Sequence, residues 1–99
     1  DVVVVSGFKV YPNEVEDVLM LHPGVSEAGV VGVPDEKSGE AVKAFVVPRP
    51  GSTVSPESVM DHCATRLARF KRPTIVRVVS ELPHSVTGKV AKRRIREGA

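Results

Sequence analysis

The stretch "VSEAGVVGVPDEKSGEAVKAFVVP", residues 25–48, decides the fold, because two valine-rich runs stand on either side of a polar turn. Beta-branched residues favour strands, and the segment "PDEKSG", residues 34–39, has the proline and glycine typical of a hairpin loop. We therefore expect residues 25–35 and 39–50 to pair as antiparallel strands in one sheet.

The N-terminal segment "DVVVVSGFKVYP", residues 1–12, carries a second strand signal. Its β-branched run is interrupted by Ser6 and Gly7 and then resumes at Phe8, which predicts two short strands joined by a tight turn. Gly7 is expected to supply the unusual backbone angles of that turn.

Two segments show helical periodicity. In "YPNEVEDVLMLHPG", residues 11–24, apolar side chains mark one face, acids occupy the first turn, and proline and glycine end the helix. In "VSPESVMDHCATRLA", residues 54–68, Ser55 is the expected N-cap and Pro56 the first helical residue. The expected buried faces consist of Val15, Val18 and Leu19 together with Val10 in the first case, and of Val59, Met60, Cys63 and Leu67 in the second.

The remaining segments complete the fold class. Residues 73–83 predict another strand and residues 90–99 a short terminal helix, so the order of elements is β-β-α-β-β-α-β-α. We predict an α+β fold: a small single domain with a short N-terminal β-hairpin and a mixed or antiparallel sheet flanked by about three helices. The chain opens at Asp1 in an apolar run without a methionine, which suggests a piece of a longer polypeptide.

Composition narrows the classes of function. Four aromatic residues disfavour a stacking platform for single-stranded nucleic acid, and a net charge of +2 argues against a dedicated nucleic-acid binder. The single cysteine, Cys63, excludes an internal disulfide and a multi-cysteine zinc site, and it indicates a reducing compartment such as the cytoplasm. No stretch approaches the ~20 apolar residues of a transmembrane helix.

Lys89 is the strongest candidate for a catalytic or ligand-binding residue. It follows Thr87 and Gly88 at the end of a loop, where glycine permits close approach and the ammonium can bind phosphate or carboxylate. The segment is not a P-loop, because Pro83 and Val90 stand where that motif needs glycine and a hydroxyl. By residue type alone, an ordinary surface lysine is the more frequent outcome.

The other polar groups give weaker signals. A basic cluster favours either a solvated face or an electrostatic funnel for a nucleotide-bearing substrate. The three histidines are scattered in the sequence, so no metal site is expected. The cluster comprises Lys89, Lys92, Arg93, Arg94 and Arg96, with Arg69, Lys71 and Arg72, and the histidines are His22, His62 and His84.

Four segments in order resemble the small C-terminal domain of acyl-CoA synthetases in the adenylate-forming superfamily. They are "SGFKVYPNEVEDVL", "VVGVPDEKSGEAVKAFVV", "FKRPTIVRVVSELPHSVTGK" and "KRRI", and together they cover almost the whole chain. The form "VYPNEVEDVL" is closer to acyl-CoA ligases than to peptide-synthetase adenylation domains, which implies CoA as the acceptor.

The resemblance implies roles for two segments. Lys89 matches the lysine that reaches into the active site during adenylation and contacts the acyl carboxylate and the α-phosphate of ATP. The hairpin residues Ser6, Gly7, Phe8 and Lys9 match the hairpin that, after rotation of the domain, faces the active site and forms part of the pantetheine channel for CoA. At the place of Lys9, other members carry a neutral amide.

The resemblance also implies what lies elsewhere. The hinge residue of the family falls immediately before Asp1, and the ATP-binding loop, the Mg²⁺ site and the acyl pocket belong to a large N-terminal domain of the same polypeptide. The fragment alone is therefore expected to be inactive. Two alternatives stay open at this point: an adenylation domain that serves a carrier protein, and a stand-alone basic binding module.

Overall fold

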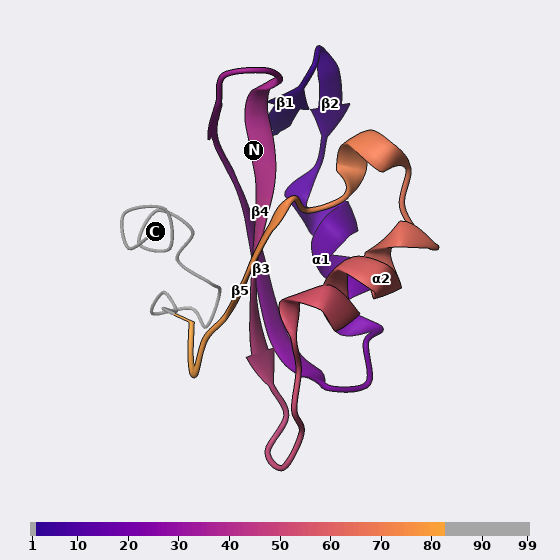
Figure 1. Ribbon diagram of the computed structural model, residues 1–99, viewed down its shortest axis with the longest axis vertical. Helices are drawn as coiled ribbons and strands as arrows, with labels where there is room; N and C mark the ends of the chain where they lie inside the picture. The colour runs from indigo at the N-terminus through magenta and orange to yellow at the C-terminus, as the bar shows by residue number, and fades with distance from the viewer. Residues whose placement is uncertain (1, 83–99) are drawn as a thin grey trace.

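The computed structural model describes residues 2–82, and its elements follow the predicted order (Figure 1). The α+β fold class is confirmed, whereas the helix expected at residues 90–99 lies outside the described residues. The elements are β1 (Val3–Val5), β2 (Phe8–Val10), α1 (Pro12–Met20), β3 (Val25–Asp35), β4 (Gly39–Pro48), α2 (Pro56–Ala64), the 3-10 helix η1 (Arg69–Lys71) and β5 (Ile75–Val78).

Strand β4 organises the sheet. It pairs antiparallel with β3 along nearly its whole length, as predicted, with a register irregularity between Val25 and Glu27. On its other edge, β4 pairs antiparallel with β1 through Val5 and Gly39, and further along it pairs in parallel with β5. The parallel pair arises because the connection from β4 to β5 crosses over through α2. The sheet is therefore mixed.

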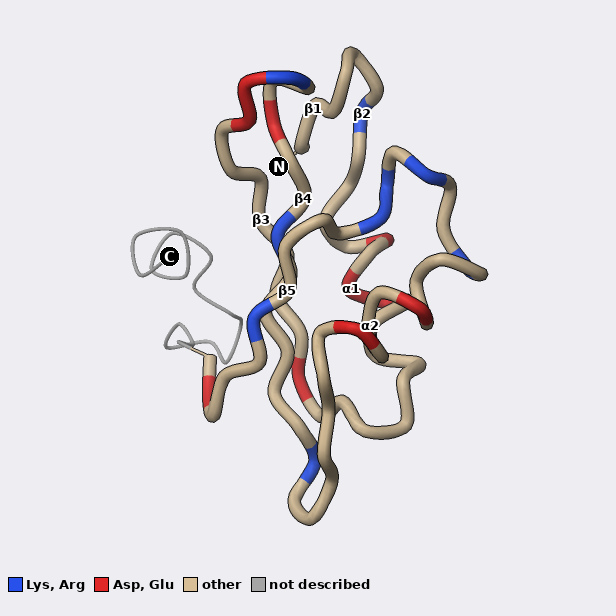
Figure 2. Tube along the Cα trace, viewed as in Figure 1, with Lys and Arg blue, Asp and Glu red and all other residues tan. Residues whose placement is uncertain are grey.

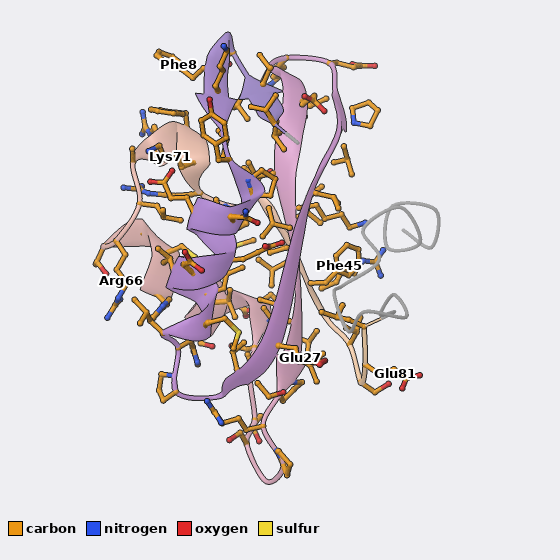
Figure 3. All side chains as sticks on the ribbon, turned by 180° about the vertical axis from the view of Figure 1, so that it is seen from behind. Phe8, Glu27, Phe45, Arg66, Lys71 and Glu81 are labelled. Carbon is orange, nitrogen blue, oxygen red and sulfur yellow. The ribbon has the colours of Figure 1, made fainter. Side chains whose placement is uncertain are left out.

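The helices α1 and α2 cover one face of the sheet and enclose the main core (Figure 1). That core is almost wholly aliphatic, as the low aromatic content predicts, and it includes Val15, Leu19, Val42, Val59 and Cys63. On the opposite face, a smaller cluster of Val31, Phe45, Val47 and Leu82 is also buried, and Figure 3 shows Phe45 on the side of the sheet away from the helices.

Local sequence signals position both helices. Helix α1 begins at Pro12 and ends at Met20, shortly before the proline and glycine that were expected to stop it. In α2, the side chain of Ser55 accepts a hydrogen bond from the Ser58 N–H at 3.1 Å, so the predicted N-cap is confirmed. The N-terminal hairpin and η1 lie at the same end of the domain (Figure 1), where β2 contacts η1.

Candidate functional site

The β1–β2 hairpin ends in a two-residue turn at Ser6 and Gly7. Both residues have positive φ angles, +51° and +85°, which is typical of the tight turns that match the twist of paired strands. The unusual conformation of Gly7 is confirmed. That of Ser6 was not anticipated, and a non-glycine residue in this region carries backbone strain.

The four predicted hairpin residues, Ser6, Gly7, Phe8 and Lys9, are all exposed. A Cβ atom built on Gly7 meets no other atom within 4 Å, so the tip faces open space. The Phe8 side chain is 55% exposed, an unusual state for a large apolar ring. The tip is therefore free to meet a ligand or another domain.

Phe8 nevertheless has a defined partner on η1. Its ring stacks on that of Phe70, with centroids 4.5 Å apart and an interplanar angle of 24°. Lys71 lies over the Phe70 ring at 5.8 Å and forms a salt bridge with Glu14 of α1 at 2.9 Å. These contacts connect the hairpin to η1 and α1, as the positions of Phe8 and Lys71 in Figure 3 illustrate.

The described part of the basic cluster lies beside this hairpin. Figure 2 shows the positive residues around η1 on the same side of the domain as β2, which contains Lys9 and contacts η1. Arg69 is exposed, whereas the Arg72 Nε–H donates to the Leu67 carbonyl at 2.9 Å and so stabilises the chain around η1. The other members of the cluster, including Lys89, lie outside the described residues.

The turn between β3 and β4 contacts the hairpin from its other side. The Ser6 N–H donates to the Ser38 carbonyl at 2.8 Å, and the Val4 N–H donates to Glu40 Oε1, also at 2.8 Å. The Asp35 carboxylate accepts hydrogen bonds within the turn, and those from the Ser38 hydroxyl and N–H lower the Asp35 pKa. The hairpin is thus held between η1 and the β3–β4 turn.

Two of the histidines that appear scattered in the sequence meet where α1 and α2 pack together. The ring centroids of His22 and His62 are 5.2 Å apart. The Gly24 N–H donates to His22 Nδ1 at 3.0 Å, and His62 Nε2 lies 2.7 Å from the Val18 carbonyl, to which it can donate. Within residues 2–82, no group of three or more His, Cys, Asp and Glu side chains could hold a metal ion.

The His22 environment predicts that the domain loses stability in mild acid. Burial, and then the positive charges of His62 and Arg66, lower the His22 pKa below its ordinary value of 6.5. The folded state therefore binds fewer protons than the unfolded state, so stability is complete above the unfolded pKa and falls as the pH drops through it. Thermal melts should give a lower Tm at about pH 5.5 than at about pH 7.5.

His22→Asn is the matched variant for this effect. An asparagine oxygen can accept the Gly24 N–H in the same local turn, but it does not titrate. The decrease in Tm between the two pH values should therefore be smaller in the variant. An equal decrease in both proteins would show that another group causes the acid sensitivity.

These features define a small α+β domain that presents an exposed, glycine-containing hairpin beside a basic 3-10 turn. No helix within residues 2–82 is long and apolar enough to cross a membrane.

The chain belongs to the AMP-binding enzyme C-terminal domain family, whose model matches residues 14–89. The long-chain-fatty-acid–CoA ligase of Escherichia coli O6:H1 is 50% identical over 99 residues, which make up 100% of this chain and 18% of that protein. The fatty acid–[acyl-carrier-protein] ligase ScoC of Streptomyces coeruleorubidus is 44% identical over 97 residues, or 98% of this chain and 19% of that protein.

The solved structures agree with this assignment. ATP-bound MatB from Rhodopseudomonas palustris matches with a TM-score of 0.93 and 41% identity, over 99% of this chain and 20% of that chain. The resemblance noted from the four sequence segments is therefore confirmed. The chain spans about a fifth of the length of these relatives.

Proposed function

We propose that residues 1–99 are the mobile C-terminal domain of an ATP-dependent acyl-CoA synthetase, and that a large N-terminal domain of the same polypeptide completes the enzyme. The complete enzyme activates a carboxylic acid, of the fatty-acid class, as acyl-AMP and then transfers the acyl group to CoA. The observation that carries this proposal is the exposed β1–β2 tip in a chain of this family.

The two half-reactions use different segments of the domain. In the first, a carboxylate oxygen attacks the α-phosphorus of ATP and pyrophosphate leaves, while the Lys89 ammonium stabilises the negative charge that develops. In the second, the sulfur of the CoA thiolate attacks the acyl carbonyl carbon, and AMP leaves with the bonding electrons. The β1–β2 tip faces the site in this second step.

The chemistry of the tip supports its role. Gly7 carries no side chain and borders open space, so the backbone can approach an extended arm of a ligand closely. Lys9 adds a positive charge near a ligand that carries phosphates.

We assign Mg²⁺ to the N-terminal domain, where it would neutralise charge on the phosphates of ATP. A cytoplasmic location stays a prediction.

One alternative acceptor has support of its own. The relative from Streptomyces coeruleorubidus is named as a ligase for an acyl carrier protein, so the acceptor thiol can belong to a carrier protein in a chain this similar. Both acceptors present a thiol to the same acyl-adenylate chemistry. We favour the enzyme over the stand-alone binding module, because the chain belongs to an AMP-binding enzyme C-terminal domain family and spans about a fifth of the length of its relatives.

A direct assay of the complete enzyme tests the proposal. Given ATP, Mg²⁺ and a fatty acid, the enzyme should exchange pyrophosphate into ATP, and added CoA should yield acyl-CoA detectable by mass spectrometry. The fragment of residues 1–99 should form neither product. Acylation of a carrier protein in preference to CoA would favour the alternative acceptor, and absence of pyrophosphate exchange with every carboxylic acid would contradict the proposal.

A further inference from the structure

We propose that the β3–β4 turn positions the β1–β2 tip for the thiol-acceptor step, with Glu40 and Asp35 as the positioning residues. This inference rests on the proposed function, since it assigns a task to residues that support the hairpin and do not touch the ligand. Neither residue carries a role in the resemblance to acyl-CoA synthetases. Glu40 acts on the Val4 N–H of β1, and Asp35 acts through Ser38, whose carbonyl accepts the Ser6 N–H.

The first observation concerns the edge of β1 that faces β4. In the described residues, β1 and β4 share one ladder pair, Val5 with Gly39. Regular backbone pairing therefore fixes only a small part of the hairpin to the sheet. On either side of this pair, the Ser6 N–H donates to the Ser38 carbonyl and the Val4 N–H to the Glu40 carboxylate, each at 2.8 Å. The Glu40 carboxylate thus accepts the hydrogen bond that a backbone carbonyl of β4 would accept in a regular ladder.

The second observation concerns how the Glu40 carboxylate is seated. A Cβ atom built on Gly32 lies 2.7 Å from Glu40 Oε2 and 2.9 Å from a methyl carbon of Val3. The absence of a side chain at Gly32 therefore leaves the space that this carboxylate occupies between β3 and β1. Glu40 Oε2 packs against Gly32, and Oε1 accepts the Val4 N–H. Together these contacts give the Glu40 side chain a defined position.

The third observation is that the turn is internally bonded. Asp35 Oδ2 lies 2.9 Å from the Ser38 N–H nitrogen, 3.1 Å from the Lys37 N–H nitrogen and 2.7 Å from the Ser38 hydroxyl. These bonds orient the Ser38 carbonyl that receives the Ser6 N–H. Since Ser6 is held at a positive φ angle, loss of that bond should allow the tip to relax to other conformations.

The experiment uses the complete enzyme and supplies acyl-adenylate directly. Glu40→Ala removes the acceptor for Val4, and we expect about a tenfold decrease in kcat/KM for CoA, because small misplacements of a reacting group are costly. Glu40→Gln keeps an oxygen acceptor of the same shape and should restore most of the activity. Glu36→Ala, in the same exposed turn, is the control and should behave as the unaltered enzyme.

A second pair of variants, Asp35→Ala and Asp35→Asn, tests the inference if Glu40→Ala does not fold. Asp35 is exposed. Asp35→Ala should lower kcat/KM for CoA, whereas Asp35→Asn should preserve it because its amide oxygen accepts the same N–H bonds. In every folded variant, pyrophosphate exchange should stay unchanged. An unchanged CoA step in the alanine variants, or an equal loss in both half-reactions, would overturn the positioning role.

The outcome for Gly7→Trp separates this inference from the proposed function. If Gly7→Trp blocks the CoA step while the alanine variants at positions 35 and 40 leave it intact, the tip acts in that step without support from the turn. If Gly7→Trp also leaves the CoA step intact, the assignment of the tip itself is wrong.

Discussion

Replacing Lys89 with alanine in the complete enzyme is expected to lower the rate of acyl-AMP formation by about 10²–10³-fold. A preorganised donor at the position where charge develops is worth this much, and a full cation can contribute more. Lys89 lies outside the described residues, and its role rests on the "TGK" match to the family. Because lysine is a residue type that is almost never fully buried, the variant should remain folded.

The measurement separates the two half-reactions. Pyrophosphate exchange should collapse in Lys89→Ala, whereas supplied acyl-adenylate should still be converted to acyl-CoA, because we propose that the hairpin, and not Lys89, faces the site in that step. Lys92→Ala and Arg93→Ala are the controls, since they remove nearby charges that only modify the surrounding field. Equal loss in both half-reactions, or normal adenylation, would remove Lys89 from the proposed catalytic role.

Gly7→Trp should have the opposite selectivity. The indole would extend from the exposed tip into the space where the pantetheine arm of CoA is expected, so the CoA step should fall to a small fraction of its original rate. Adenylation should be largely intact, because we propose that the tip faces the site only in the CoA step. Both half-reactions should be measured on the same preparation.

Gly51→Trp is a matched control for Gly7→Trp. Both glycines have a positive φ angle, +81° at Gly51 and +85° at Gly7, and neither has an atom within 4 Å of a built Cβ. The strain of placing a side chain there, roughly 1–2 kcal/mol, is therefore common to both variants. If Gly51→Trp impairs the CoA step as strongly as Gly7→Trp, strain accounts for the loss, and the steric explanation is wrong.

Much of the fold could be predicted from local patterns. The valine-rich runs on either side of residues 34–39 predicted the β3–β4 pair, and the Ser55 and Pro56 signal predicted the start of α2. The turn at Gly7 was predicted in the same way. These signals lie within a few residues of the structures that they specify, because strand alternation, helix capping and turn geometry are local properties of the backbone.

The contacts that shape the candidate site were not predictable in this way. Phe8 and Phe70 stack although they are far apart in the sequence, and the meeting of His22 with His62 contradicts the impression of scattered histidines. Nothing in the sequence around Glu40 indicates that its carboxylate accepts the Val4 N–H. Each of these contacts depends on how whole elements pack.

The sequence by itself determined the strands, the helices α1 and α2 and the α+β class. Through its likeness to a family it also assigned roles to the hairpin residues, and these roles stay proposals. Only the tertiary structure decided that β5 runs parallel to β4, and that the hairpin lies between η1 and the β3–β4 turn. The physical reason is that local propensities act over one or two turns of chain. The direction of a crossover strand and the partners of an exposed tip depend instead on which faces must be buried together in one core.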